Sequence, residues 1–235
     1  LMRSIQSALQ SGQLNSAQIV HTFTMRYLLD SNNYLPNALL NPASQLIVWG
    51  FSARQLAFWA IFIGFAIKLP IVPLHTWLPE AHVEAPTPVS VVLAGVLLKI
   101  GGYGFLRIAW DFFPDGAVNY TQILAGLGVL SIVYGGLNAL AQADLKKMIA
   151  YSSVSHMGFV LLGIASLTAE GINGAIYQMV SHGVLSAMLF LIAGVVYDRT
   201  HDRQIDSYRG LMKPMPRYTT LTAIAFFASL GLPGF

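Results

Sequence analysis

Long apolar runs dominate the chain from about residue 53 onward. A transmembrane helix needs roughly 20 consecutive apolar residues to cross the hydrocarbon core of a bilayer. Windows of that length predict six helical spans: Ala53 to Leu74, Val89 to Phe113, Gln122 to Ala141, Met148 to Leu167, Ile172 to Val196, and Tyr218 to beyond Phe235. We therefore expect an all-α, polytopic transmembrane helix bundle.

The segment before these runs has a different pattern. Residues 1–41 are rich in Ser, Gln and Asn, and their apolar residues are too scattered for a span. We expect an extramembrane segment over residues 1–41, with room for one amphipathic helix, followed by a partial transmembrane domain over residues 42–235. The chain opens on Leu1 rather than Met and stops at Phe235 inside an apolar run, which indicates an internal piece truncated at both ends.

Composition supports the membrane class. The 235 residues are 55% hydrophobic and only 10% charged, and the mean hydropathy is +0.60, so the charged surface of a soluble globule is missing. The net charge of +3 does not indicate nucleic-acid binding, because most basic residues flank apolar segments. The absence of cysteine excludes disulfides, thiolate metal sites and cysteine-held iron–sulfur clusters, and leaves histidine-held metal open.

The connecting loops carry charge of alternating sign. Basic residues gather after the third and fifth spans, at Lys146, Lys147, Arg199, Arg203, Arg209, Lys213 and Arg217. The loops after the second and fourth spans carry Asp111, Asp115 and Glu170 instead. By the positive-inside rule, the basic loops face the cytoplasm.

Proline interrupts the first and the sixth span, at Pro70 and Pro73 and again at Pro233. Proline removes a backbone donor and clashes with the preceding turn, so each helix should break and expose carbonyl groups at membrane depth. A pair of broken helices at corresponding positions indicates a transport site between structural repeats. For either proline alone, a kink that serves only packing is an equal alternative.

Ionisable residues lie inside the apolar runs, above all Lys68 and Lys99. A cation near the bilayer centre costs roughly 2.5 kcal/mol or more unless water or an anion compensates it, so these lysines predict an ion path. Lys68 also fits a helix-end lysine that reaches toward the interface, whereas Lys99 lies near the middle of its span. His182 and His156 are weaker candidates, since each also fits a hydrogen-bonded histidine between helices.

A metal site is not favoured. His75, Glu80, His82 and Glu84 lie close together, but the histidines are seven residues apart with Pro79 between them, and no zinc-binding HExxH pattern occurs. We expect these side chains to stabilise the connection after the broken helix. Gly101, Gly102 and Gly104 lie within an apolar span, so they are expected to be close-packing residues rather than a nucleotide loop.

Four sequence stretches resemble a known family. They are KLPIVPLHTWLPEAHVEAPT at Lys68–Thr87, LAGVLLKIGGYG at Leu93–Gly104, DLKKMIAYSSVSHMG at Asp144–Gly158 and QMVSHG at Gln178–Gly183. From about Ala53 to Phe235, the chain closely resembles the antiporter-like M-type membrane subunits of respiratory complex I. The phrase HTWLPEAH at His75–His82 favours these subunits over the related sodium/proton antiporters.

This resemblance implies a proton path without a redox centre in this chain. Lys68 matches the lysine of the broken helix, Lys99 the central lysine, and His182 the histidine in the following repeat. His156 is a weaker addition. The family's partner glutamate is expected before Leu1, and the lysine or glutamate of the second broken helix after Phe235.

The resemblance also implies partners and cofactors. The chain would be a subunit of a proton-translocating NADH:quinone oxidoreductase, beside other antiporter-like subunits in the lipid bilayer. NADH or ferredoxin, FMN, iron–sulfur clusters and quinone would be used by other subunits, and this chain would bind no cofactor. A bacterial cytoplasmic membrane is favoured, with the mitochondrial inner membrane and thylakoid left open. The alternatives are an Mrp-type sodium/proton antiporter subunit and a non-conducting membrane scaffold.

Overall fold

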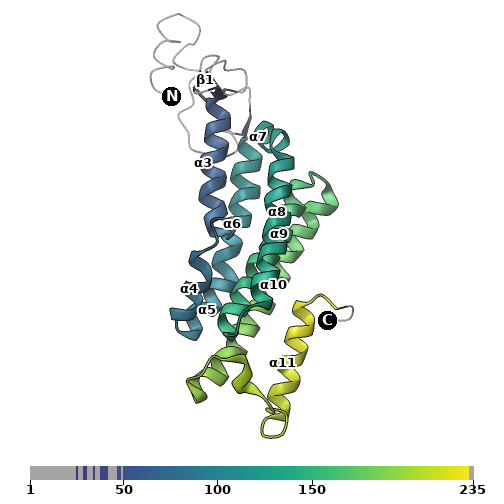
Figure 1. Cartoon of the computed structure of the whole chain (residues 1–235). Helices are drawn as coiled ribbons and strands as arrows, with labels where there is room; N and C mark the ends of the chain where they lie inside the picture. Colours follow the sequence, from purple (N-terminus) through teal and green to yellow (C-terminus); the bar gives the residue numbers. More distant parts are fainter. Residues whose placement is uncertain are drawn as a thin grey trace, which may run out of the picture. The chain divides into compact units, whose positions relative to one another are not determined.

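The computed structural model describes residues 25, 29, 30, 34, 38–41, 47, 48 and 50–232. Most of the predicted extramembrane segment 1–41 lies outside the described residues, and the boundary between 41 and 42 stays a prediction. The described chain is almost entirely helical (Figure 1), which confirms the predicted all-α class. By contacts it divides into two compact units: Leu1–Ile63 with Phe105–Asn119, and Gly64–Gly104 with Tyr120–Phe235.

In the first unit, a short hairpin of β1 (Ile47–Val48) and β2 (Phe51–Ser52) precedes α3 (Ala53–Lys68). Buried Arg54, near the start of α3, forms an ion pair with Asp115 of α7 (Pro114–Asn119), with 2.6 Å between Nη2 and Oδ1. Its guanidinium also donates to the carbonyl groups of Leu40 and Phe112. Because the buried charge is paired and its donors are used, this arginine fixes the start of the helix.

Helix α3 ends where the prolines predict, immediately before Leu69 and Pro70. Residues 69–76 form turns, so the first predicted span stays helical only to Lys68 and not to Leu74. The turns lead into α4 (Trp77–Glu84), and the indole Nε1 of Trp77 donates to the carbonyl of Ile67 at 2.8 Å. This bond satisfies one of the carbonyl groups that the broken helix leaves open.

The second predicted span is a continuous helical stretch, Thr87–Trp110, that alternates between α and π geometry. It consists of α5 (Thr87–Val92), the π-helix η3 (Leu93–Leu97), α6 (Leu98–Gly104) and the π-helix η4 (Phe105–Trp110). The π segments were not predicted. Such segments widen the turn and weaken local carbonyl pairing, and they often mark functional sites.

Three long helices, α8 (Thr121–Leu140), α9 (Leu145–Ala165) and α10 (Ala169–Thr200), form the centre of the second unit and run alongside one another (Figure 1). Small residues allow α8 and α9 to approach closely: a Cβ on Gly158 would lie 2.8 Å from the carbonyl oxygen of Gly128. A buried apolar cluster around Phe190 joins α10 to α9, to η3 and to α11 (Pro216–Ser229). Backbone groups therefore stay paired within helices while small and apolar side chains pack between them.

Within the described residues, four helices are long and apolar enough to cross a membrane: Thr87–Trp110, Thr121–Leu140, Leu145–Ala165 and Ala169–Thr200. The first and sixth predicted spans correspond to α3 and α11, which have 16 and 14 residues. Helix α11 follows the 3₁₀ turn η5 (Ile205–Tyr208) and ends before Gly231, whose φ is +72°. Pro233, the predicted second break, lies outside the described residues.

Candidate functional site

Two of the predicted site residues, Lys99 and His182, lie in direct contact. The Nζ of Lys99, on α6, lies 2.6 Å from Nδ1 of His182, on α10. The same Nζ donates to the carbonyl of Ala94 in the π segment η3. His182 is 5% exposed and Lys99 is half-buried, so the hydrogen bond is partly shielded from water. When Lys99 is an ammonium, its Nζ donates to Nδ1 of His182. When Lys99 is neutral, its Nζ accepts from a protonated Nδ1. The hydrogen bond can therefore form with the proton on either nitrogen.

Two glycines bring the helices close enough for this contact. A Cβ on Gly183 would lie 3.0 Å from the carbonyl oxygen of Gly95 and 3.5 Å from Cε of Lys99. A Cβ on Gly95 would in turn lie 3.5 Å from the carbonyl oxygen of Gly183. A side chain at position 183 would therefore push against both the facing backbone and the lysine stem.

His156, on α9, extends this pair into a cluster. Its ring centroid lies 5.2 Å from that of His182, at an interplanar angle of 54°. Its Nδ1 lies 2.9 Å from Nε2 of Gln178, one turn before His182 on α10. We refer to Lys99, His182, His156 and Gln178 as the Lys99 cluster. The structure thus brings together three of the four predicted residues.

A cavity of about 290 Å³ opens beside the two histidines, between α9, α10 and the end of α11. Its polar lining consists of His156, His182, Gln178, Tyr177 and the serines Ser152, Ser153, Ser181, Ser186 and Ser229. Each of the five serine hydroxyl groups donates to a carbonyl three or four residues earlier on its own helix. Their lone pairs remain as acceptors, which suits water or a hydrated proton.

Lys68 lies apart from this cluster. It is exposed at the last position of α3, and no hydrogen bond or ion pair of its ammonium is found within residues 50–232. Its backbone is nonetheless fixed against the helix that carries Lys99. A Cβ on Gly101 would lie 2.7 Å from the amide nitrogen of Leu69 and 3.0 Å from the carbonyl carbon of Lys68. Gly101 thus lets the broken end of α3 touch α6, as expected of a close-packing glycine.

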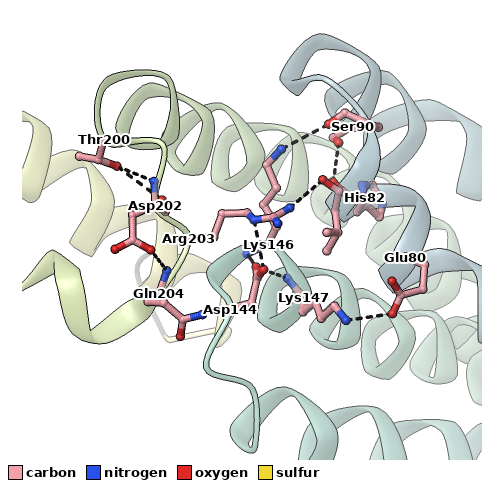
Figure 2. Close-up of polar contacts among 12 residues, drawn as sticks. Glu80, His82, Ser90, Asp144, Lys146, Lys147, Thr200, Asp202, Arg203 and Gln204 are labelled. Carbon is pink, nitrogen blue, oxygen red and sulfur yellow. Dashed lines mark hydrogen bonds and ion pairs between the residues drawn. The ribbon is translucent and has the colours of Figure 1, made fainter.

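A second polar group lies where α4, the start of α9 and the segment after α10 meet (Figure 2). Asp144 caps α9 by accepting from the amides of Lys146 and Lys147, and its carboxylate lies 3.5 Å from Nε of Arg203. Lys147 pairs with Glu80 of α4 at 2.9 Å. We refer to Asp144, Arg203, Lys147 and Glu80 as the Asp144 cluster. Its ion pairs join α4 to α9, and the segment after α10 to the start of α9.

Lys146 lies beside this cluster but points into the protein. It is 3% exposed, donates to the carbonyl of Ala85 at 3.3 Å, and places Nζ 5.0 Å from the ring centroid of Tyr197. Arg203 approaches the same ring at 5.7 Å and donates to the carbonyl of Val83. These bonds satisfy carbonyl groups at the end of α4, which is where cations stabilise a helix.

The two histidines weighed as metal ligands have different surroundings. His82 is fully buried and stacks on Phe190, with 4.2 Å between ring centroids. Neither of its ring nitrogens has a hydrogen-bond partner among the described residues. Burial first, and then the charges of Lys146 and Lys99, lower the pKa of His82 to about 4. His75 packs against Tyr134, and burial lowers its pKa as well. Among the described residues, no group of three His, Asp or Glu side chains is placed to hold a metal ion.

The predicted site residues do not include Gln178 or the cavity serines. A signal for Gln178 existed, because residues four apart on a helix share a face and Gln178 precedes His182 by four. The serines gave none, because serines are common at helix–helix contacts in membranes.

Fold and site together define a polytopic helical membrane protein with a broken helix and a buried lysine–histidine cluster beside a polar cavity. The sequence model of the family described as "NADH:quinone oxidoreductase/Mrp antiporter, TM" matches residues 9–235. The chain belongs to this family.

Curated relatives agree with the membership. NADH-quinone oxidoreductase subunit M of Rickettsia conorii is 47% identical over 215 residues, which cover 92% of this chain and 41% of that protein. NAD(P)H-quinone oxidoreductase chain 4-3 of Nostoc sp. is 54% identical over 183 residues, covering 77% of this chain and 33% of that protein. The chain therefore spans well under half the length of these relatives.

Solved structures share the fold. A chain of respiratory complex I from Thermus thermophilus matches with a TM-score of 0.73 and 40% identity, over 77% of this chain and 39% of that chain. A chain of the Mrp complex from Dietzia sp. matches with a TM-score of 0.75 and 25% identity, over 89% of this chain and 40% of that chain. The resemblance inferred from the four sequence stretches is confirmed, and so is an integral membrane location.

Proposed function

We propose that this chain is part of the proton-translocating M-type membrane subunit of an NADH:quinone oxidoreductase. In this proposal, Lys99, His182 and His156 carry protons through the membrane interior, driven by quinone reduction in partner subunits. The observation that carries the proposal is the 2.6 Å contact between Lys99 Nζ and His182 Nδ1, next to a polar cavity.

The pair supports proton transfer for a simple chemical reason. In one step, an N–H bond of the lysine ammonium breaks and an Nδ1–H bond forms on a neutral His182, so the charge moves without changing in amount. The proton on the other ring nitrogen can then leave toward His156 or cavity water. The reverse step restores the ammonium.

The surroundings favour a mobile charge over a fixed one. Among the described residues, the salt bridges do not include Lys99, so no carboxylate holds its ammonium in place. Burial disfavours the charged form of a lysine, which makes release of a proton to a neighbouring imidazole easier. The serine acceptors of the cavity support hydrated protons beyond the histidines.

In this proposal, Lys68 is the broken-helix lysine of the proton path. It ends a helix broken at Pro70, and Gly101 couples that end to the helix carrying Lys99. A carboxylate on another part of the full-length protein would pair with its ammonium. The electron donor, FMN, iron–sulfur clusters and quinone are assigned to partner subunits of the same complex.

Proton pumping tests the proposal directly. In inverted vesicles, proton uptake and NADH-dependent quinone reduction are measured for the full-length protein in its complex, as wild type and as Lys99→Ala. We expect Lys99→Ala to lower pumping at least about tenfold and to slow quinone reduction, with assembly unchanged. Lys147→Ala is the matched control, since Lys147 pairs with Glu80 at the periphery and should leave pumping intact.

The two alternatives predict other outcomes. Unchanged pumping in Lys99→Ala would support a non-conducting scaffold. The observation that supports the Mrp-type antiporter is the TM-score of 0.75 with the Dietzia chain. Such an antiporter would show sodium-dependent proton movement without quinone reduction in wild-type vesicles.

A further inference from the structure

Gln178 is the polar side chain of the Lys99 cluster to which the proposed proton path gives no task. It lies on α10 one turn before His182 and reaches across to α9, where its Nε2 lies 2.9 Å from Nδ1 of His156. Gln178 and both histidines line the same cavity of about 290 Å³. One nitrogen of His156 is thus occupied by an uncharged partner, and the other remains for exchange.

An amide is suited to a histidine that changes charge. When His156 is neutral with its proton on Nε2, the NH₂ group of Gln178 donates to Nδ1. When His156 is an imidazolium, Nδ1 carries a proton, and the amide can turn by 180° and accept with its oxygen. A carboxylate would instead favour the charged form, and an apolar side chain would leave Nδ1 without a partner.

The other polar and charged side chains around His156 are not seen to form a hydrogen bond with it among the described residues. On α9 itself, the neighbouring polar lining consists of the hydroxyl groups of Ser152 and Ser153. From α10, His182 and the phenol of Tyr177 line the same cavity, and α11 contributes Ser229. Lys99, on α6, bonds to His182, so its ammonium is directed to the other histidine.

We propose that Gln178 is a positioning residue that holds His156 in one orientation in both of its protonation states. The ring is then kept at 5.2 Å from that of His182 whether or not it carries the proton. This proposal rests on the proposed function, because it assigns a role within the same proton path. It differs from a plain interhelical hydrogen bond, whose loss would lower assembly or stability without changing the pH dependence of pumping.

Two substitutions in the full-length protein, assembled in its complex, test the role. Gln178→Met keeps the length and removes the hydrogen bond, and we expect about a tenfold loss of proton pumping. Gln178→Glu keeps a hydrogen bond but stabilises the imidazolium, and we expect the pH of half-maximal pumping to rise by about one unit. The readouts are pumping and quinone reduction from pH 5 to pH 9 in inverted vesicles.

Gln142→Met is the matched control, because Gln142 lies just after the end of α8 and its Nε2 donates to the carbonyl of Asn138 in the last turn of that helix. Wild-type pumping and pH profile in both Gln178 variants would overturn the positioning role, and so would equal losses without a pH shift in Gln178→Glu. If Lys99→Ala still abolishes pumping in that case, the proposed function stands and only the role of Gln178 fails. If Lys99→Ala pumps normally, the proposed function itself fails.

Discussion

The Lys99 cluster and the Asp144 cluster lie in the same unit and each contains a lysine, but the partners of their cations differ. At the Asp144 cluster, Lys147 meets Glu80 and Arg203 meets Asp144, so each charge is held by an opposite charge. At the Lys99 cluster, the ammonium meets an imidazole and a backbone carbonyl. A cation paired with a carboxylate stays charged and anchors a loop, whereas a cation paired with a neutral base can pass its proton on.

Protonation of His82 is disfavoured first by burial and then by the charges of Lys146, beside the Asp144 cluster, and of Lys99. The largest effect on stability is expected here. Because its folded pKa is about 4 against an ordinary 6.5, the unfolded chain binds more protons between these values, and stability falls as pH drops from about 6.5 to 4. The loss amounts to roughly 3 kcal/mol at most.

His82→Phe should remove this acid sensitivity, because Phe keeps the stack on Phe190 and cannot be protonated. The thermal denaturation midpoint of the purified complex, measured from pH 4 to pH 7.5, compares the variant with wild type. An unchanged decline below pH 6.5 in His82→Phe would assign the acid sensitivity to other groups. Pumping at pH 7.5 is measured in parallel, to separate stability from conduction.

Gly183→Ala should move Lys99 and His182 apart, and we expect it to have the next largest effect. The added Cβ would lie 3.0 Å from the carbonyl oxygen of Gly95 and 3.5 Å from Cε of Lys99, so the helices must move apart. Overpacking of this kind costs about 2 kcal/mol, and pumping should fall more than assembly does. Gly174→Ala on the same helix is the control, since a Cβ there meets nothing within 4 Å. Equal behaviour of the two variants would show that the close approach at Gly183 is unnecessary.

Asp144→Asn tests the Asp144 cluster, and we expect it to have the smallest effect of these substitutions. Asparagine keeps the capping acceptor for the amides of Lys146 and Lys147 but removes the charge that faces Arg203. We expect a loss of stability of about 0.5 kcal/mol and unchanged pumping per assembled complex. Denaturation midpoints at low and high salt check the first point, since a partly exposed ion pair weakens with salt. Lost pumping would mean that the Asp144 cluster belongs to the conducting path.

Much of the fold could be predicted because membrane helices follow simple rules. Apolar length located the helices that begin near Thr87, Thr121, Leu145 and Ala169, and Pro70 located the end of α3. The first and sixth helices came out shorter than the apolar runs that predicted them, because an apolar run continues through residues that proline and glycine exclude from helical geometry. The π segments around Leu93–Leu97 left no signal in the apolar pattern, which they do not interrupt.

The sequence by itself determined the class of protein, since transfer of long apolar runs out of water depends on composition and length alone. It also selected Lys68 and Lys99, because a charged residue in such a run needs compensation, and the family resemblance added His182. Only the tertiary structure decided that Lys99 and His182 touch, that Gln178 contacts His156, and that Lys68 forms no hydrogen bond or ion pair with them. Those facts depend on how closely helices approach at Gly95 and Gly183, and helix spacing is a property of packing between segments far apart in the chain.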